Sequence, residues 1–350
     1  MNSLTKNLEG PIKRIIFLQR EDGCIPWTED GVFDAWNHLE CVMALNTLGH
    51  SREAELGFTY LQKNQLEDGS WLGELGSTLE IDENKGTFIN RDKNSKIYFR
   101  DTNFAAYIAT ACWHDFLVNK SINNLTKNWN MIENAINFVI ENQMHDGSIR
   151  WAAKSPEAPK DDSLLTGCCS IYKSMICAIN CATQLNKEKP EWTKSLKKLE
   201  NTIRNKPESF DKTWESKKRF SMDWYYPVLC GVIGGKKAEE RINSQWNKYV
   251  LDEKGCLCVS DQPWVTIAET AELAIALIKI EKKDKARELL SWIEKYIDAD
   301  GAYWMGRQVD EKVFWPMEKP GWTSAAVILA YDALNNFSKG SKIFLDDRLI

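Results

Sequence analysis

The sequence has no long apolar run, no excess of basic residues and few histidines. No stretch reaches the roughly 20 apolar residues that a membrane-spanning helix needs, and Met1–Lys6 lacks the apolar run of a signal peptide. The net charge is −5, with acids and bases interspersed, which excludes a basic nucleic-acid-binding surface. We therefore expect a cytoplasmic protein with a small-molecule substrate, without a nucleic-acid partner or a transmembrane segment.

The chain also lacks the usual signatures of a metal centre. It has only four histidines, and its ten cysteines are not arranged in ligand pairs; Cys256-Leu-Cys258 comes nearest to such a spacing. Several cysteines lie in apolar segments, as free thiols do in a reducing compartment. We expect no metal site, and no cofactor is evident.

What the sequence does have is a short repeated signature, an Asp-Gly pair followed closely by an aromatic residue. Three copies begin with glutamine, at Gln19, Gln65 and Gln143, and a fourth copy is Asp300-Gly301-Ala-Tyr-Trp304. Each copy follows one helical segment and precedes a more apolar one. This spacing predicts a repeat of helical hairpins.

Twelve helical segments follow from apolar periodicity and breaker residues. Six are amphipathic, at about 5–20, 51–64, 128–143, 190–205, 236–250 and 284–297. Six alternate with these and are apolar on nearly every face, at about 33–48, 102–118, 164–184, 222–233, 264–280 and 321–336. The alternation predicts an all-α fold, an (α/α)6 toroid in which an outer ring surrounds an inner barrel. We expect one domain over residues 1–337 and a C-terminal tail over 338–350.

The long connections of this toroid carry the Asp-Gly signature and meet at one rim, where the inner helices begin. Rigid scaffolds carry function on such loops, and converging helix N-termini favour anionic groups. The longest connection, residues 72–100, contains two β-prone runs and predicts a small β-hairpin, which either covers the rim as a lid or is a decoration.

Acidic and aromatic residues gather near the predicted starts of the inner helices. Asp and Asn at such positions also serve as N-caps, so capping is an open alternative for each of them. Glu269 and Glu272 share one face of an otherwise apolar helix and either line a wet cavity or form a buried ion pair. The candidate catalytic residues are Asp101, Asp162, Asp223, Glu269 and Glu318. The candidate substrate-binding residues are Trp36, His38, Arg100, Asn103, Trp224, Tyr225, Asp261, Trp264, Glu272 and Trp322.

The repeat resembles that of terpenoid cyclases and protein prenyltransferase β subunits. Runs such as Trp36-Asn-His38-Leu-Glu40, Arg100-Asp-Thr-Asn-Phe104 and Ser221-Met-Asp-Trp-Tyr225 resemble bacterial prenyltransferase-like proteins. The resemblance implies an enzyme with an apolar, isoprenoid-type substrate. The Asp-x-Asp-Asp acid of the cyclases is absent, since Pro159–Asp162 lacks its first Asp, and so is the zinc-binding histidine of the prenyltransferases.

Two other functions fit the same toroid. Glucoamylase-like glycosidases share the ring and place two carboxylates at this rim, and Asp101–Tyr107 and Gly321–Ala326 are loosely similar to their sequences. Their substrate would be a carbohydrate, with Asp223, Glu269 or Glu318 supplying the acid–base pair. The third possibility is a ligand-binding toroid without catalysis. The shape of the barrel interior distinguishes these alternatives, because a deep aromatic tunnel, a shallow crater with acids and a plugged lumen are different structures.

Overall fold

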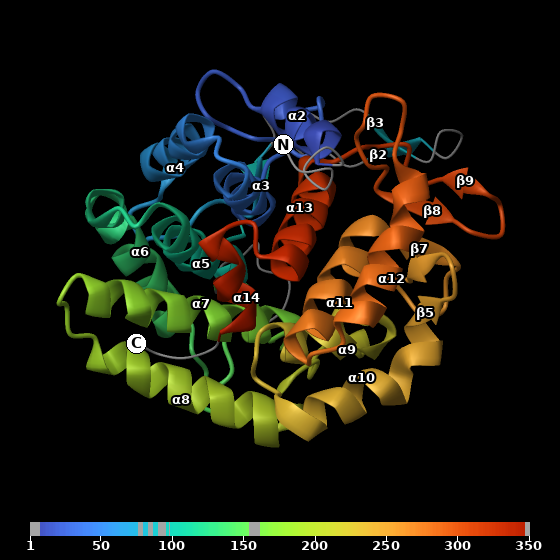
Figure 1. Cartoon of the computed structure of the whole chain (residues 1–350). Helices are drawn as coiled ribbons and strands as arrows, with labels where there is room; N and C mark the ends of the chain where they lie inside the picture. The colour runs from blue at the N-terminus through green and yellow to red at the C-terminus, as the bar shows by residue number, and fades with distance from the viewer. Residues whose placement is uncertain are drawn as a thin grey trace.

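The computed structural model describes residues 8–75, 80–82, 87–89, 96–97, 99–153 and 162–346. Within this part of the chain the twelve predicted helices form two concentric rings (Figure 1). The inner helices are α3 (Ala35–Thr47), α5 (Thr102–Asn119), α7 (Leu165–Gln184), α9 (Ser221–Leu229), α11 (Ile267–Lys279) and α13 (Gly321–Asn335). The outer helices are α2 (Glu9–Leu18), α4 (Ser51–Asn64), α6 (Ile122–Glu141), α8 (Pro190–Asn205), α10 (Gly235–Tyr249) and α12 (Lys283–Ile293).

The inner ring is closed, because each inner helix packs against the next and α13 packs back against α3. The predicted (α/α)6 toroid is therefore confirmed.

Burial explains the difference between the outer and the inner helices. On α8 the buried side chains include Trp192, Leu196, Leu199 and Ile203, which form a single stripe at helical spacing. On α5 nearly every side chain is buried, because outer helices cover one side and the barrel interior covers the other.

The Asp-Gly signature joins neighbouring outer helices. In the second copy, Gln65 Nε2 donates to Gly69 O at 2.9 Å and to Met131 O of α6 at 3.0 Å. Gly69 has a φ of +89°, and a Cβ placed there would lie 2.2 Å from Asn134 O of the same helix. The fourth copy closes the outer ring, because a Cβ on Gly301 would lie 2.8 Å from Gly10 Cα of α2. The Asp-Gly turns of the motif thus hold neighbouring outer helices together.

Short antiparallel strands occupy the connections that lead from outer to inner helices. β1 (Glu74–Leu75) pairs with β4 (Lys96–Ile97), and β2 (Glu80–Asp82) pairs with β3 (Thr87–Ile89), as the predicted hairpin in residues 72–100 requires. β5 (Val250–Leu251) pairs with β6 (Gly255–Cys256). A three-stranded sheet has the order β7 (Trp264–Thr266), β8 (Gly306–Gln308), β9 (Val313–Phe314), with Val265 opposite Arg307 and Arg307 opposite Phe314. Whether the β2–β3 hairpin acts as a lid stays a prediction.

The remaining helical turns are short: η1 (Pro207–Ser209), η2 (Lys217–Arg219), η3 (Glu294–Tyr296), η4 (Lys339–Ser341) and α14 (Lys342–Leu345). The last two belong to the expected C-terminal tail, and they pack across the ends of α5, α11 and α13 (Figure 1). Ile343 is buried, and Lys173 Nζ and Lys279 Nζ donate to Asp346 O and Phe344 O at 3.1 and 2.8 Å. This segment closes the barrel at the end opposite the rim.

All ten cysteines are free thiols, and nine of them are buried. No helix among the described residues is long and apolar enough to cross a membrane. The same residues contain no group of three or more His, Cys, Asp or Glu side chains that could hold a metal ion.

Candidate active site

A cavity of about 320 Å³ opens at the rim where α3, α5, α7 and α9 begin. It brings together three of the predicted site residues, Trp36, Asp101 and Asn103. The rest of its wall is largely aromatic and aliphatic. Further residues that line this cavity include Phe104, Ile149, Trp151, Leu165, Cys168, Lys217, Phe220 and Met222.

Asp101 is the carboxylate in the wall of this cavity. It is the N-cap of α5, and its Oδ1 accepts both cap bonds, from Asn103 N at 2.8 Å and Phe104 N at 3.0 Å. Oδ2 accepts no hydrogen bond from the residues that the structure describes. Burial raises the pKa of Asp101 to about 7, against the two backbone N–H donors, and the nearby charge of Asp34 adds to the rise. Asp101 thus combines a fixed position with a proton affinity suited to general acid catalysis.

Aromatic rings form one side of the cavity. Trp151 lies between Phe99 and Trp214, with ring centroids 5.3 and 6.0 Å away, and Lys217 Nζ lies 5.2 Å above the Trp214 ring. Trp151 is the aromatic residue of the third Asp-Gly copy, and neither it nor Phe104, Lys217 or Phe220 is among the predicted site residues. Phe104 lies in the first turn of α5, whereas Trp151, Lys217 and Phe220 come from connections that only the fold places beside it.

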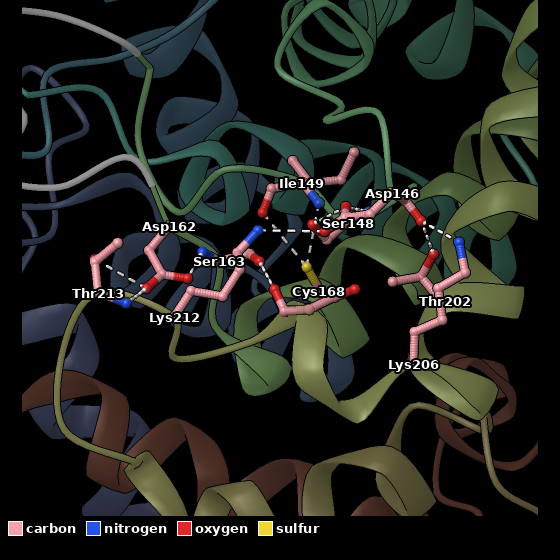
Figure 2. A network of polar contacts seen from close by, with 11 residues as sticks. Asp146, Ser148, Ile149, Asp162, Ser163, Cys168, Thr202, Lys206, Lys212 and Thr213 are labelled. Carbon is pink, nitrogen blue, oxygen red and sulfur yellow. Dashed lines mark hydrogen bonds and ion pairs between the residues drawn. The ribbon is translucent and has the colours of Figure 1, made fainter.

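A polar network holds this wall in place (Figure 2). Asp146, in the third Asp-Gly turn, accepts from Ser148 Oγ at 2.6 Å and Lys212 Nζ at 3.2 Å, and its backbone oxygen accepts from Thr202 and Lys206. Nearby, Ile149 N donates to Cys168 Sγ at 3.4 Å. The network ties the 142–153 turn to the loop after α8, so the cavity wall that Ile149 and Cys168 form is rigid.

Trp36 separates the rim cavity from a second, buried cavity of about 40 Å³ on the barrel axis. Its ring lies 5.8 Å from Tyr107 and 6.3 Å from Tyr226, both of which line the deeper space. Among the described residues, aromatic side chains therefore stand between the two cavities. The two are not continuous, as the deep tunnel that an isoprenoid chain needs would be.

Glu272 and Glu40 face each other beneath this aromatic layer. Glu272 accepts hydrogen bonds from the hydroxyls of Tyr225 and Tyr226, and Tyr107 donates to Glu40 at 3.4 Å. Burial raises the pKa of Glu272 to about 7, and burial together with the charge of Glu272 raises that of Glu40 well above its usual value. The predicted residues Glu272 and Tyr225 thus form a buried proton-holding cluster, together with Glu40, which the sequence did not single out.

Glu269 stands in the first turn of α11, half-buried and beside Cys258. In the ring order, α11 is directly opposite α5, so Glu269 and Asp101 belong to opposite sides of the rim. Three other predicted rim residues form contacts further along this edge. Trp322 packs edge-on against Trp27 at 5.4 Å, Trp264 donates to Trp315 O at 2.6 Å, and the buried Glu318 accepts from Met305 N through its backbone oxygen.

Three predicted residues connect structural elements instead of lining either cavity. His38 is fully buried; its Nδ1 accepts from Ile25 N and its Nε2 donates to Gly57 O, so it links α3 to α4 as a neutral ring. Burial lowers the pKa of His38 to about 4. Trp224 stacks on Tyr249 at 5.1 Å and donates to Arg241 O of α10. Asp223 faces the same outer helix, where the Arg241 charge counteracts the rise that burial causes in its pKa.

The last three predicted residues hold loops. Asp162 accepts from Ser163 N and Thr213 N at 2.7 and 2.6 Å; burial acts to raise its pKa, but these donors hold the pKa below its usual value. Arg100 pairs with Asp68 at 2.8 Å, and the exposed Asp261 pairs with Arg219 at 2.7 Å. Arg100 thus props a loop, and Asp162 connects two loop segments without capping α7, whose N-cap residue is Leu164. Asp161, part of the imperfect Asp-x-Asp-Asp run, lies outside the described residues.

The sequence is related to a carbohydrate-active enzyme. Over 326 residues it is 38% identical to the MMP endo-(1,4)-3-O-methyl-alpha-D-mannosidase of Mycolicibacterium hassiacum, an alignment that covers 93% of this chain and 85% of that enzyme. The chain belongs to the family of this mannosidase. No protein-family model matches the chain.

Solved structures agree with this family in fold. A glycosidase in complex with glucose superposes with a TM-score of 0.70 at 11% identity, covering 97% of this chain and all of that one. A D-mannose isomerase gives 0.69 at 12% identity, over 95% of this chain and 97% of the isomerase. The GH63 mannosylglycerate hydrolase of Thermus thermophilus gives 0.66 at 8%, over 92% and 99%. At these identities the likeness establishes the toroid alone.

The family corrects the prenyltransferase-like prediction, which is wrong. That prediction rested on the Gln-x-x-Asp-Gly copies, and these are ring-building turns that any chemistry on a toroid can use. The chain is an enzyme of glycosidase kinship, so the transferase and cyclase assignments fall with the prediction. The glycosidase alternative, with a carbohydrate as substrate, is the interpretation that remains.

Proposed function

We propose that this protein is a glycoside hydrolase that cleaves α-mannosidic bonds within a chain of 1,4-linked, partly 3-O-methylated mannose residues. The proposal is supported first by membership in the family of the Mycolicibacterium hassiacum mannosidase. It is supported second by a rim cavity whose wall combines one raised-pKa carboxylate with aromatic rings. Rings such as Trp151 and Phe104 offer flat faces on which sugars stack, and aliphatic groups such as Leu165 and Met222 suit methyl ethers.

In the mechanism that we favour, Asp101 is the general acid. Its unbonded Oδ2 carries the proton at neutral pH and delivers it to the glycosidic oxygen as the bond to the anomeric carbon breaks. Glu269, on the opposite side of the ring, takes a proton from a water molecule that attacks the anomeric carbon. This arrangement inverts the anomeric configuration and needs the two carboxyl groups roughly 6.5–9.5 Å apart. No cofactor is required, and the free thiols fit a reducing compartment such as the cytoplasm.

The single observation that carries the assignment is that Asp101 accepts both cap bonds through Oδ1 and leaves Oδ2 to carry a proton. It can be tested with substrates whose leaving groups differ in whether they need a proton. Asp101→Asn should lose roughly 10²–10⁴-fold in kcat/KM on a methylated manno-oligosaccharide, because the leaving oxygen needs a proton. The same variant should retain most activity on a dinitrophenyl α-mannoside, whose leaving group needs none. Glu269→Gln should lose activity on both substrates, and NMR should detect the β-anomer as the first product.

Asp115→Asn is the matched control. Asp115 lies on the same helix, is buried and also has a pKa raised by burial. It stands near the C-terminal end of α5, away from the rim, with Asn46, Asn119 and Asn124 as hydrogen-bond partners. This variant should keep its activity on both substrates. Equal losses in Asp101→Asn and Asp115→Asn, or equal losses of Asp101→Asn on both substrates, would show that Asp101 is not the acid.

A further inference from the structure

Asn103 is a buried side-chain amide without a hydrogen-bond partner among the described residues. It occupies the first turn of α5, is 5% exposed and lines the rim cavity. Its Oδ1 is buried and accepts no hydrogen bond, and no described residue bonds to its Nδ2. The cap bond to Asp101 uses its backbone N–H and leaves the side-chain amide uninvolved.

Such a residue needs an explanation, because buried polar side chains are nearly always hydrogen-bonded. Leaving an acceptor unsatisfied costs about 1–3 kcal/mol relative to an apolar group of the same shape. The helix does not require it, since Asp101 already caps α5. Packing does not require it either, because Leu165 and Phe104 show that apolar side chains suit this wall. The amide is therefore placed for a ligand in the cavity.

We propose that Asn103 binds a free hydroxyl group of the sugar whose glycosidic bond Asp101 protonates; this inference rests on the proposed function. The amide oxygen can accept a hydrogen bond only from a donor, and a sugar hydroxyl supplies one, whereas a methyl ether cannot. Asn103 and Asp101 both line the rim cavity, so both reach the sugar unit that is bound there. Asn103 thereby fixes which position must stay unmethylated, while the aliphatic wall tolerates methyl groups elsewhere.

The test compares substrates that differ at one hydroxyl. A set of manno-oligosaccharides, each with a single hydroxyl replaced by hydrogen or by O-methyl, is assayed with wild type and with Asn103→Leu. For one position, wild type should lose roughly 5- to 150-fold in kcat/KM, which corresponds to 1–3 kcal/mol. Asn103→Leu should treat that modified substrate and its parent alike, within about twofold.

A stability measurement separates recognition from a structural role. Because Asn103→Leu removes an unpaired amide, its Tm without ligand should rise by about 1–3 °C. Asn128→Leu is the control, an equally buried asparagine (5% exposed) on α6 that lines neither the rim cavity nor the central one. It should discriminate among the substrates as wild type does.

The outcomes also separate this inference from the proposed function. If wild type hydrolyses the parent but Asn103→Leu keeps the full discrimination, or has a lowered Tm, the inference is overturned and the hydrolase stands. If wild type hydrolyses no mannoside, calorimetric titration of the same sugars decides. Binding that needs Asn103 and one hydroxyl would uphold the inference without the reaction, and binding that is independent of Asn103 would overturn it.

Discussion

Replacing Gly69 by alanine tests whether the Asp-Gly signature holds the outer ring together. Gly69 has a φ of +89°, where an alanine costs about 1–2 kcal/mol in backbone strain. In addition, its Cβ would lie 2.2 Å from Asn134 O and 2.5 Å from Asn134 C. These are backbone atoms of a long helix that cannot rotate away, so α6 must shift, at a further cost of roughly 1–3 kcal/mol. Together these effects predict a loss of about 2–5 kcal/mol.

Gly49→Ala provides the matched control. Gly49 has nearly the same backbone angle, +84°, but a Cβ there meets nothing within 4 Å. It should therefore lose only the strain contribution of about 1–2 kcal/mol. Both variants are compared with wild type by urea unfolding monitored by far-UV circular dichroism, with equal m-values as the check that the denatured states match. Equal losses of unfolding free energy in the two variants would show that the Asp-Gly signature does not hold neighbouring outer helices together.

Three further predictions concern the site and the barrel. On a manno-oligosaccharide, the kcat/KM of wild type should fall as pH rises through about 7, because Asp101 must be protonated to act, and the residual activity of Asp101→Asn should lack this alkaline fall in a pH–rate profile on the same substrate. The raised pKa of Glu272 makes the native state bind more protons than the unfolded state above pH 4.5, so stability should fall between pH 4.5 and about 7. Glu272→Gln should show a smaller fall in Tm over that range. A profile identical to that of wild type would contradict the buried pair of Glu272 and Glu40. His38→Ala leaves Ile25 N–H unpaired and removes the bond to Gly57 O, so it should lower the free energy of unfolding by about 2–4 kcal/mol while the folded enzyme keeps its kcat; a lost kcat at full stability would place His38 in the site instead.

The fold could be predicted from the sequence because its signals are local and repeated. A stripe such as Trp192–Ile203 on α8 and the uniformly apolar α5 identify outer and inner helices without knowledge of their neighbours. Ring closure follows from their strict alternation. The reaction could not be predicted in the same way, because the Gln-x-x-Asp-Gly copies that suggested a prenyltransferase are needed by the ring and not by a substrate.

The site was only partly predictable, for a geometric reason. Asp101 and Asn103 could be selected because helix N-termini gather at one rim in any toroid. The direction in which a side chain points could not be predicted from the sequence. Trp224 lies in the first turn of its inner helix, yet it faces α10 instead of the cavity, whereas Met222, two residues earlier, lines the wall. Similarly, Lys217 enters the cavity from a loop whose path depends on the Asp162–Thr213 contact.

The hydrogen bonds around each acid distinguish the structural carboxylates Asp34 and Asp162 from the candidate catalyst. Asp34 uses both carboxylate oxygens, Oδ1 for Asn37 N and Oδ2 for Trp27 Nε1 and Asn37 Nδ2. Asp162 likewise accepts through both, from Ser163 N and Thr213 N. Asp101 satisfies its two cap donors with one oxygen and leaves the other beside the cavity. A cap that uses only one oxygen holds the carboxyl group in place and leaves the other oxygen able to carry a proton. Asp101, the N-cap of α5, can therefore both stabilise the helix and act as the acid of the reaction.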